Sequence, residues 1–271
     1  IENIDIGGPT LVRAAAKNYY DVTVITSTKQ YSELINELKN NKGTTSIEFR
    51  KKMSQIAFTE TAYYDTLISN YFSNITNVSF PEKKIIQANL IEKLRYGENP
   101  HQNASIYSQN GELKLDLIQG KKLSFNNYND IFAALTISKT FPKNTGTVII
   151  KHANPCGASI HKNKLDSYRS ALACDPISAF GGIVSCNFRV NKELALELNK
   201  IFLEVIIGNG FEKEALKILK LKKNLRIIDA SNFSLGETLK FHSFSDAILL
   251  QTDDKKIFSK KDFQFVSKKK T

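Results

Sequence analysis

The sequence predicts an α/β protein built from two modules, and two observations carry this prediction. In the second half of the chain, short runs rich in Val and Ile alternate with longer segments whose apolar residues recur at helical spacing. Such an alternation is typical of helices layered against a sheet. Between residues 73 and 90 the periodicity fades into sequence containing Asn, Ser and Pro, which indicates a linker or domain boundary. We therefore place one module at residues 1–90 and the other at residues 91–271.

The first module is predicted to be mainly helical and to hold only part of a sheet. The glycine turn Gly-Gly-Pro-Thr at residues 7–10 precedes an Ala-rich stretch that favours a helix. These elements cannot complete a sheet domain by themselves. In order, the predicted elements are a strand at 3–6, a helix at 11–20, a strand at 22–26, and helices at 31–40 and 46–72.

The second module is predicted to contain five strands and four helices up to residue 230, after which the signals weaken. The most apolar strand is the run TVIIK at residues 147–151. The predicted strands lie at 104–108, 147–151, 182–187, 204–208 and 225–229. The predicted helices lie at 128–139, 165–174, 192–202 and 212–221.

The composition is that of a folded protein with a basic surface. The 271 residues carry a formal net charge of +11, but the lysines are scattered over predicted helix faces and the extreme C-terminal end. We therefore favour a solvated surface over a nucleic-acid platform. The apolar runs are far shorter than the roughly 20 residues that span a bilayer, so no membrane segment is expected. Three cysteines without a CxxC pair suit reduced thiols in a cytoplasmic protein.

The run KHANPCG at residues 151–157 directly follows the strand TVIIK, at the end of a strand where α/β proteins expose reactive groups. His152 can exchange a proton near neutral pH, and the ammonium of Lys151 can stabilise developing negative charge. Together they suit acyl transfer. A zinc nucleobase deaminase is disfavoured, because Asn154 stands where that chemistry requires Glu and no second Cys follows Cys156 at the right spacing.

Three further segments offer ligand contacts, and each of them also has a purely structural interpretation. In LRYGENPHQ, Arg95 and Tyr96 fit either a phosphate contact or a surface ion pair. In CDPISAFGGI, Phe180 could stack on a heterocycle or fill a turn, and Gly181 allows close approach of a ligand. Glu204 could accept hydrogen bonds from a substrate amide or simply be a charge at the start of a strand.

Near the N-terminus, Asp5 and Lys17 flank a predicted helix N-terminus that attracts anions. Spacing alone favours a helix-capping region with a surface lysine over an acid–base pair.

Six motifs in order resemble one family: IDIGGPTLVRAAAKN, AFTETAYYD, LRYGENPHQ, VIIKHANPCG, CDPISAFGGI and EVII. They resemble the bifunctional purine-biosynthesis enzymes that combine AICAR transformylase and IMP cyclohydrolase. The resemblance covers nearly the whole chain and thins only after about residue 230. It implies the C-terminal part of a methylglyoxal-synthase-like domain, followed by a truncated cytidine-deaminase-like three-layer α/β/α subdomain.

The resemblance also implies roles for the candidate residues. His152 would accept a proton from the 5-amino group of AICAR as that group attacks 10-formyltetrahydrofolate, and Lys151 would assist at the formyl oxygen or the departing folate nitrogen. Asp5 and Lys17 would help to close formyl-AICAR to IMP. Positions implied to hold AICAR are Arg95, Tyr96, Asn129, Phe180, Gly181 and Glu204.

By the same resemblance, the reduced folate is a co-substrate, no metal is required, and the enzyme is a cytoplasmic homodimer. The chain opens with IENIDIGG, without an initiator Met or a secretory pattern, so we expect an internal fragment that lacks both ends of the enzyme. Folate contacts would then lie beyond Thr271. Three alternative hypotheses remain: a basic module that binds RNA or nucleotides without catalysis, a zinc deaminase, and an inert half-enzyme.

Overall fold

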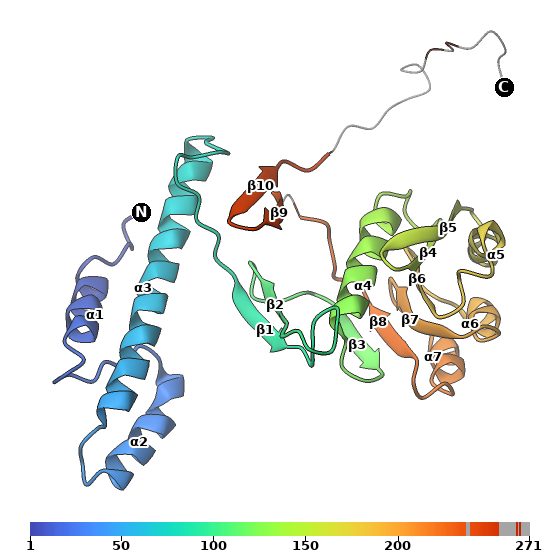
Figure 1. The fold of residues 1–271 in the computed structure, drawn as a ribbon. Helices are drawn as coiled ribbons and strands as arrows, with labels where there is room; N and C mark the ends of the chain where they lie inside the picture. The colour runs from blue at the N-terminus through green and yellow to red at the C-terminus, as the bar shows by residue number, and fades with distance from the viewer. Residues whose placement is uncertain (237–238, 255–263, 265, 267–271) are drawn as a thin grey trace. The chain divides into compact units, whose positions relative to one another are not determined.

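The computed structural model describes residues 1–236, 239–254, 264 and 266 (Figure 1). The chain forms two compact units, which are described separately. The first contains residues 1–90 together with 107–111, and the second contains residues 91–106 together with 112–271.

The first unit is helical. The long helix α3 (Ile47–Ile75) packs against α1 (Gly7–Lys17), and their shared core includes the buried side chains of Ala16, Met53 and Ala57. The side chain of Ser46 caps α3 by accepting a hydrogen bond from the Phe49 N–H at 3.2 Å. The helix α2 (Tyr31–Asn40) has the predicted bounds, and a short 3₁₀ helix (Thr28–Gln30) precedes it.

Two strands predicted for this unit are wrong. Residues 3–6 form a turn that leads into α1, and residues 22–26 are not assigned to a strand. A strand exists only where a neighbouring strand accepts and donates its backbone hydrogen bonds. The described part of this unit supplies no such neighbour for either segment. The predicted glycine turn is instead the first turn of α1, where Pro9 is tolerated.

The second unit contains a six-stranded mixed sheet, which confirms the predicted α/β class. Its strand order is β3-β8-β7-β6-β4-β5. The strands β6, β7 and β8 are parallel, and the other three each run antiparallel to a neighbour. The strand bounds are β3 Asp116–Gln119, β4 Gly146–Lys151, β5 Asn154–Ile160, β6 Gly182–Cys186, β7 Leu203–Gly208 and β8 Arg226–Asp229.

Helices cover both faces of this sheet (Figure 1). The helix α4 (Phe125–Ser138) packs on one face with Val148 and Ile150, whereas Ile149 points into the core on the other face. Successive residues of a strand alternate between faces, so β4 contributes to both cores. The helices on the face opposite α4 are α5 (Lys164–Cys174), α6 (Lys192–Leu198) and α7 (Lys213–Leu219).

Four further strands form two small two-stranded sheets. The pair β1 (Asn89–Lys93) and β2 (Ser105–Ser108) encloses the LRYGENPHQ loop. The pair β9 (Lys240–Phe244) and β10 (Ala247–Gln251) follows β8. Of these four, only β2 was predicted from the sequence.

Candidate functional site

The Lys151–His152 pair lies at one edge of the six-stranded sheet. Because β4 runs antiparallel to β6, the end of β4 lies beside the beginning of β6, and Ile150 pairs with Ile183. The edge is therefore the C-terminal end of β4 but the N-terminal end of the three parallel strands. This differs from the usual arrangement, in which ligands bind at the carboxyl ends of parallel strands. The antiparallel direction of β4 brings Lys151 to Gly181, which directly precedes β6.

The segment after Lys151 is a tight hairpin turn. Lys151 pairs with Asn154, so the turn consists of His152 and Ala153 alone. Both residues have positive φ, 52° and 58°. This left-handed conformation costs roughly 1–2 kcal/mol for each residue with a Cβ. The exposed His152 is thus held in a strained position at the tip of the hairpin.

The Lys151 ammonium is fixed by backbone carbonyls of the neighbouring segment. Its Nζ donates to the carbonyl oxygens of Gly181 at 2.9 Å and Phe180 at 3.3 Å. These bonds use two of the three N–H donors of the ammonium. Gly181 has a φ of 69°, and a Cβ there would lie 3.0 Å from the Lys151 Nζ, so glycine suits this position on both grounds.

An exposed aromatic pair adjoins this ammonium. The Phe180 side chain is 63% exposed although it is large and apolar. Its ring centroid lies 5.4 Å from that of Phe202, with the two planes tilted by 48°. Exposed aromatic faces next to a fixed cation offer a surface on which a flat heterocycle can stack.

The carboxylate of Glu204 lies at the same edge and is turned toward α4. A register shift pairs Gly182 with Leu203 and Ile183 with Val205, which leaves Glu204 as the extra residue of a β-bulge. Its Oε2 accepts a hydrogen bond from the Asn127 Nδ2 at 3.1 Å.

The structure brings Asn127, and not the predicted Asn129, to Glu204. Asn127 is 5% exposed and forms a capping box with Ser124 at the start of α4. Asn129 is exposed, and residues two apart in a helix do not share a face. Asn129 was predicted to line the AICAR base and not to contact Glu204, so that assignment stays a prediction, and Asn127 is an additional residue at this site.

The Arg95–Tyr96 loop is attached to the first turn of α4. The Asn126 Nδ2 donates to the Glu98 carbonyl at 3.4 Å, and the Tyr128 hydroxyl donates to Glu92 at 2.9 Å. Burial raises the pKa of Tyr128, and the bond to Glu92 adds to this shift. The Arg95 guanidinium lies 5.4 Å from the centroid of the Tyr96 ring. The beginning of α4 thus lies between this basic loop and Glu204.

The three cysteines differ in burial, and their alkylation order is a testable consequence. Cys174 is exposed, Cys156 is half-buried and Cys186 is buried. Burial raises the pKa of Cys156, and it raises the pKa of Cys186 to about 12. Because the thiolate is the reactive form, we expect iodoacetamide at pH 8 to label Cys174 first, then Cys156, and Cys186 only after unfolding. Peptide mass spectrometry over a time course measures this order, and fast labelling of Cys156 would contradict it.

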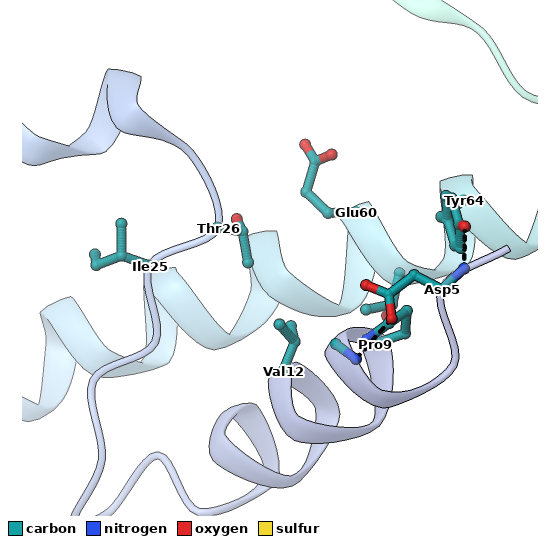
Figure 2. Close-up of a pocket in the computed structure, with 9 residues that line it drawn as sticks. Asp5, Pro9, Val12, Ile25, Thr26, Glu60 and Tyr64 are labelled. Atoms are coloured by element: carbon teal, nitrogen blue, oxygen red, sulfur yellow. Dashed lines mark hydrogen bonds between the residues drawn. The ribbon is translucent and has the colours of Figure 1, made fainter. Parts of the chain in front are cut away.

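A separate pocket of about 360 Å³ lies in the helical unit (Figure 2). Asp5 forms its rim: its Oδ1 accepts the Gly8 N–H at 2.9 Å, and its own N–H donates to the Tyr64 hydroxyl at 2.8 Å. A Cβ at Gly8 would meet the Asp5 carboxylate, so a larger residue there would displace that side chain from the pocket rim. The lining residues are Asp5, Gly8, Pro9, Val12, Ile25, Thr26, Glu60, Thr61 and Tyr64.

Lys17 does not share this pocket with Asp5. It is the last residue of α1, whereas Asp5 precedes the first. At 1.5 Å of rise per residue, the helix separates their backbones by roughly 15 Å. Lys17 is exposed at that far end. The structure of this unit therefore does not bring the two together.

Comparison with known proteins decides the family. Residues 15–271 match the model of a family described as the AICARFT/IMPCHase bienzyme. The chain belongs to this bienzyme family. It is 42% identical over 271 residues to the bifunctional purine biosynthesis protein PurH of Leptospira biflexa, covering 99% of this chain and 53% of that relative.

Two other bienzyme relatives show the same relationship. The PurH of Clostridioides difficile is 41% identical over 277 residues, with 100% of this chain and 54% of the relative covered. The PurH of Listeria monocytogenes EGD-e is 39% identical over 274 residues, with 99% of this chain and 53% of the relative covered. The chain thus spans about half the length of the curated relatives it matches.

Among the described residues, no three His, Cys, Asp or Glu side chains come together as a metal site. Within residues 1–236 and 239–254, no helix has the length and apolar character needed to cross a membrane.

The sequence did not single out several residues that the structure places at the two candidate sites. Thr26, Glu60 and Tyr64 line the pocket near Asp5, and the Thr26 Oγ1 is buried without a hydrogen-bond partner. Glu60 and Tyr64 lie within the motif AFTETAYYD, which carried the family resemblance without residue assignments. At the sheet edge, Asn127 and Asp130 were missed. A capping-box pattern at Ser124 could have shown that Asn127 turns back toward the helix N-terminus.

Proposed function

We propose that the protein carrying this chain transfers a formyl group from 10-formyltetrahydrofolate to the 5-amino group of AICAR and then closes formyl-AICAR to IMP. The observation that supports formyl transfer best is the strained turn that holds His152 beside the fixed ammonium of Lys151. Family membership supplies the substrates.

The proposed formyl transfer divides its tasks between these two residues. The 5-amino nitrogen of AICAR attacks the formyl carbon, and a new C–N bond forms while the bond to the folate N10 breaks. His152 accepts the proton that the amino group loses, and N10 gains a proton as it departs. The Lys151 ammonium stabilises the negative charge that develops on the formyl oxygen, a role that suits a cation already fixed in place.

The neighbouring groups would hold the nucleotide. We propose that Arg95 and Tyr96 contact its phosphate and that Phe180 and Gly181 adjoin its base. Glu204 would accept hydrogen bonds from the polar groups on the imidazole ring. The proposal keeps the exposed Asn129 near the base and adds Asn127, because Asn127 contacts Glu204.

The ring closure to IMP is assigned to the pocket next to Asp5. In that step the carboxamide nitrogen attacks the formyl carbon and water leaves, so a carboxylate that can exchange protons at the pocket rim is suitable. Lys17 is proposed to act outside that pocket, because α1 separates it from Asp5.

The finer expectations from the family resemblance are part of the same proposal. The helical unit would be the C-terminal part of a methylglyoxal-synthase-like domain with a linker, and residues 91–271 a cytidine-deaminase-like subdomain. The active protein would be a cytoplasmic homodimer that needs reduced folate but no metal.

A Glu204→Gln variant of the full-length protein tests the substrate assignment. Loss of a charge-assisted hydrogen bond is worth about 1.5–3 kcal/mol, so we expect KM for AICAR to rise about tenfold or more. The rate of tetrahydrofolate formation, followed at varied AICAR concentrations, gives KM and kcat. Glu214→Gln is the matched control, because Glu214 is exposed on α7. Absence of formyl transfer by the unmodified protein would overturn the proposed function, whereas an unchanged KM would overturn only the role of Glu204.

A further inference from the structure

We propose that Asp130 is a positioning residue for formyl transfer, which holds the His152–Ala153 turn in its left-handed conformation. The inference rests on the proposed function, because it concerns the geometry of the histidine to which that function assigns proton transfer. The contact that carries it is a hydrogen bond of 2.6 Å from the Ala153 N–H to the Asp130 Oδ1.

The turn needs an external partner because its own residues disfavour it. Two-residue hairpin turns with positive φ at both positions usually contain Asn-Gly, Asp-Gly or Gly-Gly, since these residues tolerate the left-handed region. Here His152 and Ala153 both carry a Cβ, and their φ angles are 52° and 58°. The pairing of β4 with β5 also stabilises the turn only weakly. The reason is that β5 is an edge strand and that its register with β4 shifts between Ile149 and Ile150.

Asp130 is itself held rigidly enough to act as such a partner. It lies in α4, whose first turn is fixed by the capping box between Ser124 and Asn127. The next residue, Ile131, and Ala134 are both fully buried against the sheet. A carboxylate accepting a backbone N–H forms one of the stronger hydrogen bonds in proteins.

A second side-chain bond acts on the same peptide group of the turn. The Asn154 Nδ2 donates to the His152 carbonyl at 2.9 Å. The N–H and the carbonyl of the single peptide group that joins His152 to Ala153 therefore both have side-chain partners, and the partner of the N–H lies on a different element. The same helix also contacts Glu204 through Asn127, so α4 sets the distance between the proposed proton acceptor and the proposed substrate contact.

Loss of the Asp130 carboxylate is expected to release the turn and displace the imidazole. Displacement of a reacting group by about 1 Å can reduce a rate about 10²-fold without altering substrate binding to the same extent. In the full-length protein, we expect Asp130→Ala to lower kcat for formyl transfer about 10- to 100-fold and to change KM for AICAR less than about threefold. Asp130→Asn retains an oxygen acceptor and should recover part of this loss.

A double-mutant cycle with Ala153→Gly separates positioning from general stabilisation. Glycine adopts positive φ without strain, so the turn should no longer depend on the aspartate. In the A153G background, we expect Asp130→Ala to lower kcat by less than about threefold. The matched control is Asp166→Ala, which removes a half-buried aspartate from the first turn of α5. An equal loss in both backgrounds, or a kcat for Asp130→Ala within about twofold of the unmodified protein, would overturn the inference.

Hydrogen exchange tests the same contact without an activity assay. The Ala153 amide should be protected in the unmodified protein and should exchange at least about tenfold faster in Asp130→Ala. If the unmodified protein lacks formyl transfer but this protection is lost in the variant, the contact stands and only the proposed function falls. Unchanged exchange at Ala153 would overturn the positioning role whatever the activity.

Discussion

A His152→Ala substitution in the full-length protein is expected to lower kcat for formyl transfer about 10²- to 10⁴-fold, the range typical of a lost general base. The KM for AICAR should change less than about threefold, because a group that acts in the transition state contributes little to ground-state binding. The position of His152 supports this expectation: it is exposed at the tip of the β4–β5 hairpin and lies next to the fixed ammonium of Lys151. Steady-state formation of tetrahydrofolate at varied AICAR concentrations measures both quantities.

His161→Ala is the matched control for this prediction. His161 is also exposed and directly follows β5, at the opposite end of that strand from the turn. A rate loss equal to that of His161→Ala, or a loss expressed mainly in KM, would exclude His152 as the proton acceptor. Closure of formyl-AICAR, supplied directly as substrate, should proceed at the unmodified rate in the His152 variant, because that reaction is assigned to the pocket near Asp5.

The central strands and the longer helices were predictable because their signals are local. Runs such as VII in β4 and VII in β7 are buried on both faces and need no alternation to be recognised as strands. The α2 and α3 helices have apolar residues at helical spacing, and their predicted bounds agree with the structure to within three residues.

The errors concern elements whose existence depends on distant partners. β5 contains Pro155 and Gly157, which disfavour a strand, and it forms because β4 pairs with it. Conversely, residues 3–6 and 22–26 have suitable composition for strands but no described neighbour with which to pair. The helix predicted to reach residue 202 ends at Leu198, because the chain must turn before β7 begins at Leu203.

The candidate site was predictable as separate motifs but not as an arrangement. Lys151 and the Phe180–Gly181 segment were chosen independently, and the pairing of β4 with β6 is what joins them. Asn127 was not singled out, because only the fold shows which face of α4 meets β7. No local pattern marks Asp130, because its contact with Ala153 crosses 23 residues of sequence.

Gly157→Ala is expected to destabilise the second unit, which contains the six-stranded sheet, by about 3 kcal/mol. This value is near the upper end of the cost of adding a methyl group to a well-packed core. Gly157 is buried on β5, and a Cβ there would lie 1.9 Å from the Ala171 carbonyl oxygen and 2.9 Å from its carbon. The obstructing atoms belong to the backbone of α5 and cannot rotate away as a side chain could. The substitution must therefore move the helix or the strand.

Ala158→Ser is the matched control, because it also adds one heavy atom but at the neighbouring exposed position of β5. We expect that variant to stay within about 0.5 kcal/mol of the unmodified protein. Urea unfolding followed by circular dichroism gives both free energies of unfolding. A loss below about 1 kcal/mol for Gly157→Ala would mean that α5 moves away from β5 at little cost, and the last glycine of KHANPCG would then not be required for packing. A loss of about 3 kcal/mol in the free energy of unfolding would show that Gly157 is required for the close approach of α5 to β5. That close approach fixes β5, the strand that follows the His152 turn.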